Sequence, residues 1–255
     1  MSAKKTRKPR TASPPAASAW LKQLLQQLAR AAMADARRMT QFPSSSLHAL
    51  RVRMKKLRAL LRLADAVIPA GTMDSLTISI REVKDPLAPA RDAEVLRKTA
   101  TRFDAAHTLP HSAADSALPD LQPVLRRLQQ RLARLDLGAL QWTGITQAHN
   151  KIRRRTRKAM KRSKRSGEAS DFHRWRRRVK DLYFQRLALH GNAKGAKPLR
   201  RLRKLARFLG NVQDLAMLEE HLGRFTAADA LLSRIASERD ALQRKALRKG
   251  RKVAK

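Results

Sequence analysis

The sequence predicts an all-α protein, and three observations support this fold class. From residue 20 onward, almost every long segment repeats its apolar residues with the 3.6-residue period of an amphipathic helix. Clusters of Pro and Gly divide the chain into segments of about 15 to 28 residues, a length typical of helices. A hydrophobic fraction of 42% over 255 residues is enough for a buried core. The chain should therefore fold into a sizeable helical domain.

The predicted helices follow one another in two sets. About eight are expected, a first set over residues 20–39, 47–68, 72–84 and 89–107 and a second over residues 119–137, 139–165, 171–190 and 198–222. A further helix over residues 226–249 closes the chain. Residues 75–80 alternate briefly like a β-strand, and we interpret them as a helix start or a loop. Short connections between successive helices favour antiparallel bundles.

Composition also predicts the domain organisation. Residues 1–18 carry five Lys or Arg and three Pro, a composition that cannot form a core, so we predict a disordered basic tail. Residues 19–250 are predicted to form one helical domain, with a first half of about 19–110 and a second half of about 119–250. Residues 251–255 are interpreted as a basic C-terminal tail.

A short motif occurs twice in the chain, 125 residues apart. It places His, Arg and Lys at offsets 0, +3 and +7, and its two copies are His48, Arg51 and Lys55, and His173, Arg176 and Lys180. At 100° per residue these offsets fall at about 0°, 300° and 340° on a helix. Each copy therefore presents one cationic stripe, and the apolar residues of the same segment take the opposite side.

A second aligned element supports an internal repeat. Leu87 and Asp92 follow the first motif copy, and Leu209 and Asp214 follow the second. Both pairs have the same spacing of five residues. We infer two copies of one helical module related by a pseudo-two-fold axis. Such an axis would bring the two cationic stripes face to face across a central cleft.

The charge of the chain demands an anionic partner. The 58 Lys and Arg residues face only 20 Asp and Glu, which gives a net charge of +38. This excess of positive charge indicates an anionic partner: nucleic acid, an acidic membrane surface or a phosphate polymer.

The lack of cysteine excludes disulfides, thiolate nucleophiles and cysteine-ligated metals. No apolar run reaches the length of about 18 residues typical of a membrane span, and no signal peptide is recognised, so we expect a cytoplasmic protein without a membrane partner.

The residue types of the stripes suit phosphate oxygens. Arginine offers a planar fork of donors, lysine a mobile charge, and histidine a donor that gains positive charge beside an anion. Aromatic residues, on which single-stranded nucleic acid would stack, make up only 4% of the chain. Two further basic faces are predicted, one with Arg154 and Arg157 and one with Lys197, Arg201 and Lys204. Such faces are also typical of solvated helix surfaces.

These motifs resemble the CHAD domain, a family named for its histidine-bearing α-helical repeat. The resemblance rests on residues 48–58, 172–180 and 209–215 and covers roughly residues 19–250. It implies two four-helix bundles about a pseudo-two-fold axis, with inorganic polyphosphate held in a central basic groove or pore. By matching position the implied ligands are His48, Arg51, Lys55, Arg58, His173, Arg176, Arg177 and Lys180, with Lys197, Arg201 and Lys204 as additions. The basic stripes add Arg62, Arg154 and Arg157.

The two copies of the motif are not equivalent. Arg58 and Arg62 extend the first stripe, whereas Tyr183 and Leu187 interrupt the second at the corresponding distance. We therefore expect the first copy to hold a polyanion more strongly than the second.

Three functions compete for this pattern. The first is a non-catalytic polyphosphate-binding or granule-targeting module located on polyphosphate granules. The second is nonspecific binding of DNA or RNA by the same basic surface. An enzyme is disfavoured because the chain has no Gly-Lys-Ser/Thr phosphate loop and too few acids near its basic helices to hold Mg²⁺. We expect no catalytic residue, no cofactor and no metal site, and we make no prediction of the oligomeric state.

Overall fold

The computed structural model describes residues 16–109, 119–191, 197–224 and 229–253, and within these ranges all regular secondary structure is helical. The α-helices are α1 (Ala17–Arg37), α2 (Pro43–Leu61), α3 (Ala70–Lys84), α4 (Ala88–Thr101), α5 (Gln122–Ala133), α6 (Trp142–Ser166), α7 (Ala169–His190), α8 (Lys197–Leu222) and α9 (Asp229–Val253). Two short 3-10 helices, η1 (Arg62–Ala64) and η2 (Ala106–Thr108), follow α2 and α4. The predicted all-α fold class is confirmed, and residues 75–80 lie inside α3.

Local chemistry explains where several helices begin and end. α2 begins at Pro43, ahead of the predicted start, because proline needs no hydrogen-bond partner in the first turn of a helix. α6 ends at Gly167, whose φ of 69° lies in the left-handed region that glycine adopts without strain. α4 ends at Thr101, earlier than predicted, and Asp104 has a φ of 57°, which prevents the helix from continuing.

The helical region is longer at both ends than the sequence predicts. Most of the predicted N-terminal tail lies outside the described residues, but α1 already begins at Ala17. At the other end α9 continues to Val253, so Arg251 and Lys252 are helical rather than part of a tail. Cationic side chains are favourable in the last turn of a helix, where the helix dipole is negative.

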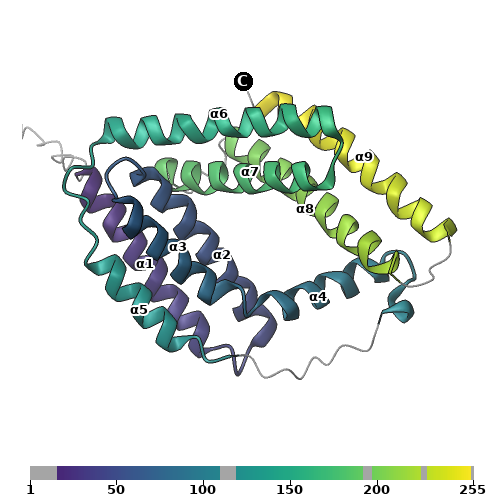
Figure 1. Ribbon diagram of the computed structural model, residues 1–255, viewed down its shortest axis with the longest axis horizontal. Helices are drawn as coiled ribbons and strands as arrows, with labels where there is room; N and C mark the ends of the chain where they lie inside the picture. Colours follow the sequence, from purple (N-terminus) through teal and green to yellow (C-terminus); the bar gives the residue numbers. More distant parts are fainter. Residues whose placement is uncertain (1–15, 110–118, 192–196, 225–228, 254–255) are drawn as a thin grey trace, which may run out of the picture.

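Two hydrophobic clusters form the interior. The first contains the buried faces of α1, α2, α3 and α5, together with η1 and the first turn of α6. The second contains the buried faces of α7, α8 and α9, the middle of α6 and the end of α4. α6 and α7 run side by side along the top of the molecule in the view of Figure 1. α7 also packs directly against α2. The two motif copies therefore lie on adjacent helices.

These clusters do not follow the predicted division of the chain between residues 110 and 119. α5 belongs to the second half of the sequence, but Leu125 and Leu128 are buried in the first cluster, where α5 packs against α1 and α3. α4 belongs to the first half, but it packs against α8 and buries Ala100 in the second cluster. An amphipathic period shows that one side of a helix is buried and does not show which neighbour covers it.

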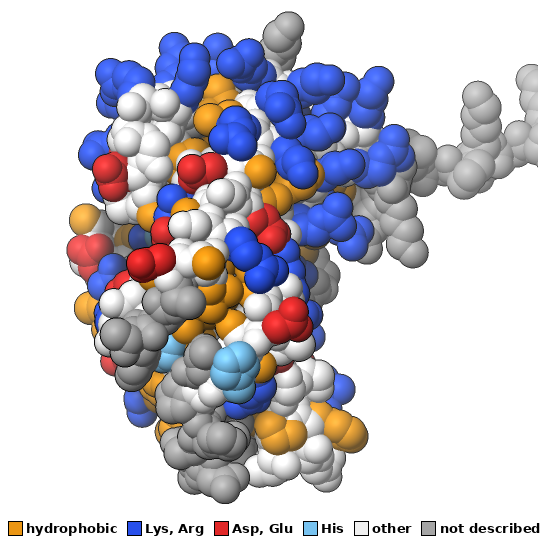
Figure 2. All heavy atoms as spheres, turned by 90° about the vertical axis from the view of Figure 1, so that its right-hand side faces the viewer, with side chains coloured by type: hydrophobic (Ala, Val, Ile, Leu, Met, Phe, Trp, Pro, Cys, Tyr) orange, Lys and Arg blue, Asp and Glu red, His pale blue; other side chains and the backbone are white. Residues whose placement is uncertain are grey.

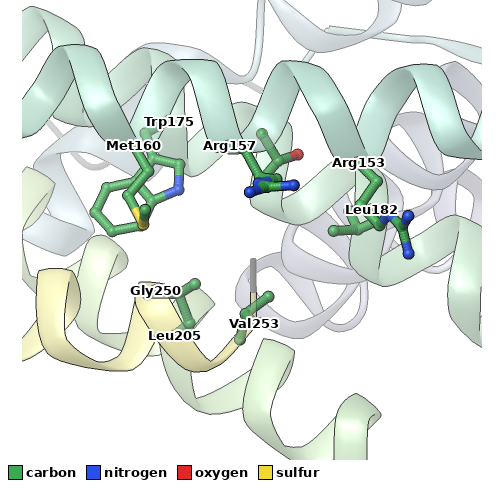
Figure 3. A pocket seen from close by; sticks show the side chains of 9 residues that line it. Arg153, Arg157, Met160, Trp175, Leu182, Leu205, Gly250 and Val253 are labelled. Carbon is green, nitrogen blue, oxygen red and sulfur yellow. The ribbon is translucent and has the colours of Figure 1, made fainter. Parts of the chain in front are cut away.

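α9 passes over α6 and α7 at a point that leaves no room for a side chain. Gly250 lies against Trp175 of α7 and Met160 of α6 (Figure 3). A Cβ atom on Gly250 would lie 2.6 Å from the Trp175 ring and 2.7 Å from the Met160 sulfur, closer than nonbonded atoms approach. The remaining cavity measures about 10 Å³, which is room for about one water molecule. This contact is a packing interface.

We predict that Gly250→Ala lowers the free energy of unfolding by about 1–3 kcal/mol, because the buried Trp175 ring must move to admit the methyl group. Urea denaturation followed by tryptophan fluorescence measures the change. Gly71→Ala is the matched control, since a Cβ atom there meets nothing within 4 Å and alanine favours a helix over glycine. Equal stability of the two variants would contradict the close packing of α9 on α7.

Candidate anion-binding site

The two motif helices and α4 bring five cationic side chains together. These are Arg51 and Lys55 of α2, Arg176 and Lys180 of α7, and Arg91 of α4, all partly buried, and we call them the central cluster. The pKa of Lys55 falls to about 7, first because burial penalises its charged form and then because the other four charges act on it. The sequence-predicted Arg51, Lys55, Arg176 and Lys180 are thus brought to one place.

Two carboxylates balance part of this charge. Arg91 donates to Asp92 Oδ1 at 2.7 Å and to Asp214 Oδ1 at 3.4 Å. Burial raises the pKa of Asp214, although the charges of Arg176 and Arg91 act in the opposite direction. Because five cations face two carboxylates here, the central cluster is net positive when all its members are protonated.

Part of the hydrogen-bonding capacity of the central cluster is unused. Nε of Arg176 is buried and has no acceptor among the described residues. Burial lowers the pKa of Lys180 as well, and its ammonium lies 5.9 Å from the centre of the Phe184 ring. Partly buried cations without enough acceptors are a strong electrostatic site for an anion, because water screens them poorly.

Beside the central cluster, a pocket of about 220 Å³ opens between α2, η1, α3 and α7. Its cationic lining consists of Arg58, Arg62, Arg81, Lys84 and Arg177, and we call it the arginine pocket. Thr77 adds a hydroxyl group to the lining. Arg51 donates to the backbone carbonyl of Lys84 at 3.3 Å, so the arginine pocket adjoins the central cluster.

A buried carboxylate, Asp181 of α7, organises the arginines of this pocket. It accepts hydrogen bonds from Arg58 at 3.5 Å and from Arg62, and Nη1 of Arg178 lies 3.9 Å from its Oδ2. Three guanidinium groups share one carboxylate, so the group stays net positive. Nε of Arg58 is buried and finds no acceptor in the part of the chain that the structure describes. Asp181 therefore joins α2 to α7 without neutralising either helix.

The two motif histidines have different surroundings. His48 is exposed near the start of α2. His173 is half-buried, and its Nδ1 lies 2.6 Å from Oε1 of Gln213. Burial lowers the pKa of His173 although the Gln213 contact acts in the opposite direction. His173 also borders an open depression that contains Glu219 and Glu220, so it lies at the edge of the cationic region.

The other predicted site residues lie away from the central cluster. Arg154 and Arg157 are exposed on α6, and Arg157 lies at the contact with α9 (Figure 3). Lys197, Arg201 and Lys204 are exposed at the start of α8. Arg176 approaches α8 at Gly210, which at 1.5 Å per residue is about 9 Å along the helix from Lys204 and about 20 Å from Lys197.

Several basic residues of the site were not predicted. They are Arg91, Arg81, Lys84 and Arg178, together with Arg155, the α6 residue whose charge lowers the pKa of both Arg62 and Arg178. Arg91 had a signal, because it directly precedes Asp92 in the aligned repeat. Arg81 and Lys84 had none, because they belong to a helix without the motif.

The described residues contain neither a candidate metal-binding cluster nor a helix suited to span a membrane. No group of three or more His, Cys, Asp or Glu side chains there is placed to hold a metal ion. No helix in the same ranges combines the length and the apolar character needed to cross a bilayer.

Comparison with known families gives a result that agrees with the motifs. The family model of the CHAD domain matches residues 21–223, more than half of the chain. The chain belongs to the CHAD domain family. The match takes in nearly all of α1 and the whole of α2 to α8, and therefore every residue of the central cluster and the arginine pocket, while α9 lies beyond it. No curated protein and no solved structure matches the chain.

We predict that Lys55→Met stabilises the fold of this CHAD domain while it weakens anion binding. Below pH 7 Lys55 is protonated in both the folded and the unfolded state, and folding must bury its charge. Above pH 7 the folded protein holds a neutral Lys55, and folding must instead remove a proton from the unfolded-state lysine. This cost falls as the pH rises and disappears near pH 10.5, where the unfolded-state lysine is itself neutral. The stability gain should therefore be largest near pH 7 and shrink toward pH 10. Urea denaturation across this range measures it.

Lys98→Met is the control for this substitution, since Lys98 is exposed on α4. A stability gain for Lys55→Met that is independent of pH, or no larger than that of the control, would show that Lys55 is not held in a desolvated cationic environment.

Proposed function

We propose that this CHAD domain binds inorganic polyphosphate, without cleaving it, along the surface formed by the central cluster and the arginine pocket. The observation that carries this proposal is the packing of α2 on α7, which collects partly buried cations from both motif copies. Three arginines there, Arg58, Arg62 and Arg178, share the one buried carboxylate of Asp181, so most of their charge is not neutralised. Binding of this kind would direct the protein to polyphosphate granules.

The degree of burial favours a thin polymer over a bulky one. A polyphosphate chain carries charge on every unit and has no bases or sugars, so its oxygens can approach the half-buried Lys55 and Arg176. The forked donors of arginine suit such oxygens. A nucleic-acid duplex presents its phosphates on a wide helix, and it would reach mainly the exposed basic residues.

Two matching electrostatic interactions support a central basic groove with pseudo-two-fold symmetry. Burial lowers the pKa of both Arg51 and Arg176, while the negative charge of Asp92 acts in the opposite direction on Arg51 and that of Asp214 does so on Arg176. Arg51 matches Arg176, and Asp92 matches Asp214, in the internal repeat. We interpret the two motif helices as the walls of this groove, with the arginine pocket as an extension on the side of the first copy.

Polyphosphate should raise the thermal unfolding midpoint of the protein by about 5 °C or more. A ligand that binds only the folded state contributes about 2.7 kcal/mol at a hundredfold excess over its dissociation constant. Charge reversal at Arg51→Glu and Arg176→Glu should abolish most of this shift. Differential scanning fluorimetry with long-chain polyphosphate measures both effects.

The matched control reverses Arg126 and Arg134, which are exposed on or next to α5, and it changes the net charge by the same amount. It should keep the polyphosphate shift. An unchanged midpoint of the wild-type protein would refute the proposed function. Displacement of polyphosphate by duplex DNA at equal phosphate concentration, in about 150 mM salt, would favour the nucleic-acid alternative.

Polyphosphate binding at pH 8 should take up protons. Lys55 is mostly neutral at this pH because its pKa is about 7, and a bound polyanion stabilises the charged form. The expected uptake approaches about one proton per bound site. Calorimetry in two buffers of different ionisation enthalpy measures it, and Lys55→Arg, which is charged before binding, should remove most of the uptake. Equal uptake by Lys55→Arg would show that another group titrates.

A further inference from the structure

A second basic surface lies on α6 and the C-terminal half of α9. It consists of the exposed Lys and Arg side chains of residues 154–165 and 244–252 other than Arg155, which faces η1, and we call it the α6–α9 surface. Neither range contains an Asp or a Glu. Lys and Arg side chains crowd the top of the molecule in Figure 2, where Figure 1 places α6 and the end of α9.

The fold brings these two acid-free segments into direct contact. Gly250 lies against Met160, and Arg157 lines the same small cavity as Val253 (Figure 3). Among the described residues, Arg162 is the only cation of the two ranges that pairs with a carboxylate, that of Asp171. The packing of α9 on α6 and α7 thus holds like charges together, and an external anion would relieve their repulsion.

This surface is separate from the central cluster. The side of α6 that faces η1 carries Lys151, which pairs with Asp65 at 3.0 Å, and Arg155, whose charge acts on Arg62. Lys161 lies on the outer side of α6, away from its buried residues, and Lys158 is exposed about 10 Å along the helix from Lys151. α9 also lies beyond the residues that the CHAD family model matches.

We propose that the α6–α9 surface binds the phosphate backbone of double-stranded nucleic acid without reading its base sequence. The basic ranges extend for about 17 Å on α6 and about 12 Å on α9, and they cross rather than continue one another, so the surface is at least two helices wide. A duplex has two phosphate strands about a groove and can contact both rows, whereas a single polyphosphate chain can follow only one.

Side-chain chemistry also favours a duplex over a single strand. Residues 154–165 and 244–252 contain no aromatic residue on which an unpaired base could stack. Their exposed lysines and arginines keep their water and can contact phosphates at many positions, which is typical of sequence-independent binding. The half-buried central cluster offers neither this width nor this access.

The test compares two variants that each remove four charges. The first combines Lys158→Gln, Lys161→Gln, Arg248→Gln and Arg251→Gln on the α6–α9 surface. The control combines Arg30→Gln, Arg126→Gln, Arg127→Gln and Arg134→Gln, all exposed on or near α1 and α5. Fluorescence anisotropy with a labelled DNA duplex measures the dissociation constant over a series of salt concentrations.

We expect the first variant to bind the duplex at least about tenfold more weakly, with the salt slope reduced by about 3 to 4, since each lost phosphate contact reduces it by about 1. The control should bind nearly as the wild-type protein does. Equal loss in both variants would overturn the proposal, because net charge alone would then explain binding.

A polyphosphate arm separates this proposal from the proposed function. The α6–α9 variant should keep the polyphosphate-induced rise in unfolding midpoint. Loss of that rise, with duplex binding intact, would assign the surface to polyphosphate and overturn the proposal. Failure of the wild-type protein to respond to polyphosphate would refute the proposed function only, since duplex binding is measured independently.

Discussion

The packing of α2 on α7 depends on a carboxylate buried between helices of like charge. Asp181 of α7 accepts hydrogen bonds from Arg58 and Arg62 across the interface, and beside it the partly buried Asp214 of α8 accepts one from Arg91 of α4. A buried charge is tolerated only when it is paired, so each carboxylate holds its arginines in place. Because the cations outnumber these acids, the interface is held together and still keeps an excess of positive charge. The remaining donors, such as Nε of Arg176, are fixed in position before any ligand arrives.

The sequence predicted the parts of this structure that depend on local pattern. Helix type followed from periodicity, and the motif at Arg51, Lys55, Arg176 and Lys180 identified four of the five members of the central cluster. Local pattern could not predict which distant segments would pack together. Arg91 reaches the cluster only because α4 packs on α8, and Arg81 and Lys84 reach the arginine pocket only because α3 lies beside α2. The sequence of one helix shows which of its own residues are charged. It does not show which charged residues a neighbouring helix will place beside them.

The inequality of the two motif copies has a structural counterpart. Arg58 and Arg62 pair with Asp181 and line the arginine pocket, whereas Tyr183, at the position that matches Arg58, packs against the ring of Phe184 at 5.4 Å. His173 contacts Gln213, but the residue aligned with Gln213 in the first copy is Arg91, which cannot accept a hydrogen bond. The stronger hold of the first copy on a polyanion stays a prediction.

The break between α3 and α4 makes the two halves of the chain depend on each other. In the second half α8 continues unbroken through Gly210, whereas in the first half Pro86 and Pro89 separate α3 from α4, and α4 packs on α8. α4 then covers part of the second core, while α5, which follows it, returns to the first core. A chain that arose by duplication would have lost, through this exchange, the independence of its copies. We therefore expect neither half to be stable alone, because each would leave part of its core uncovered.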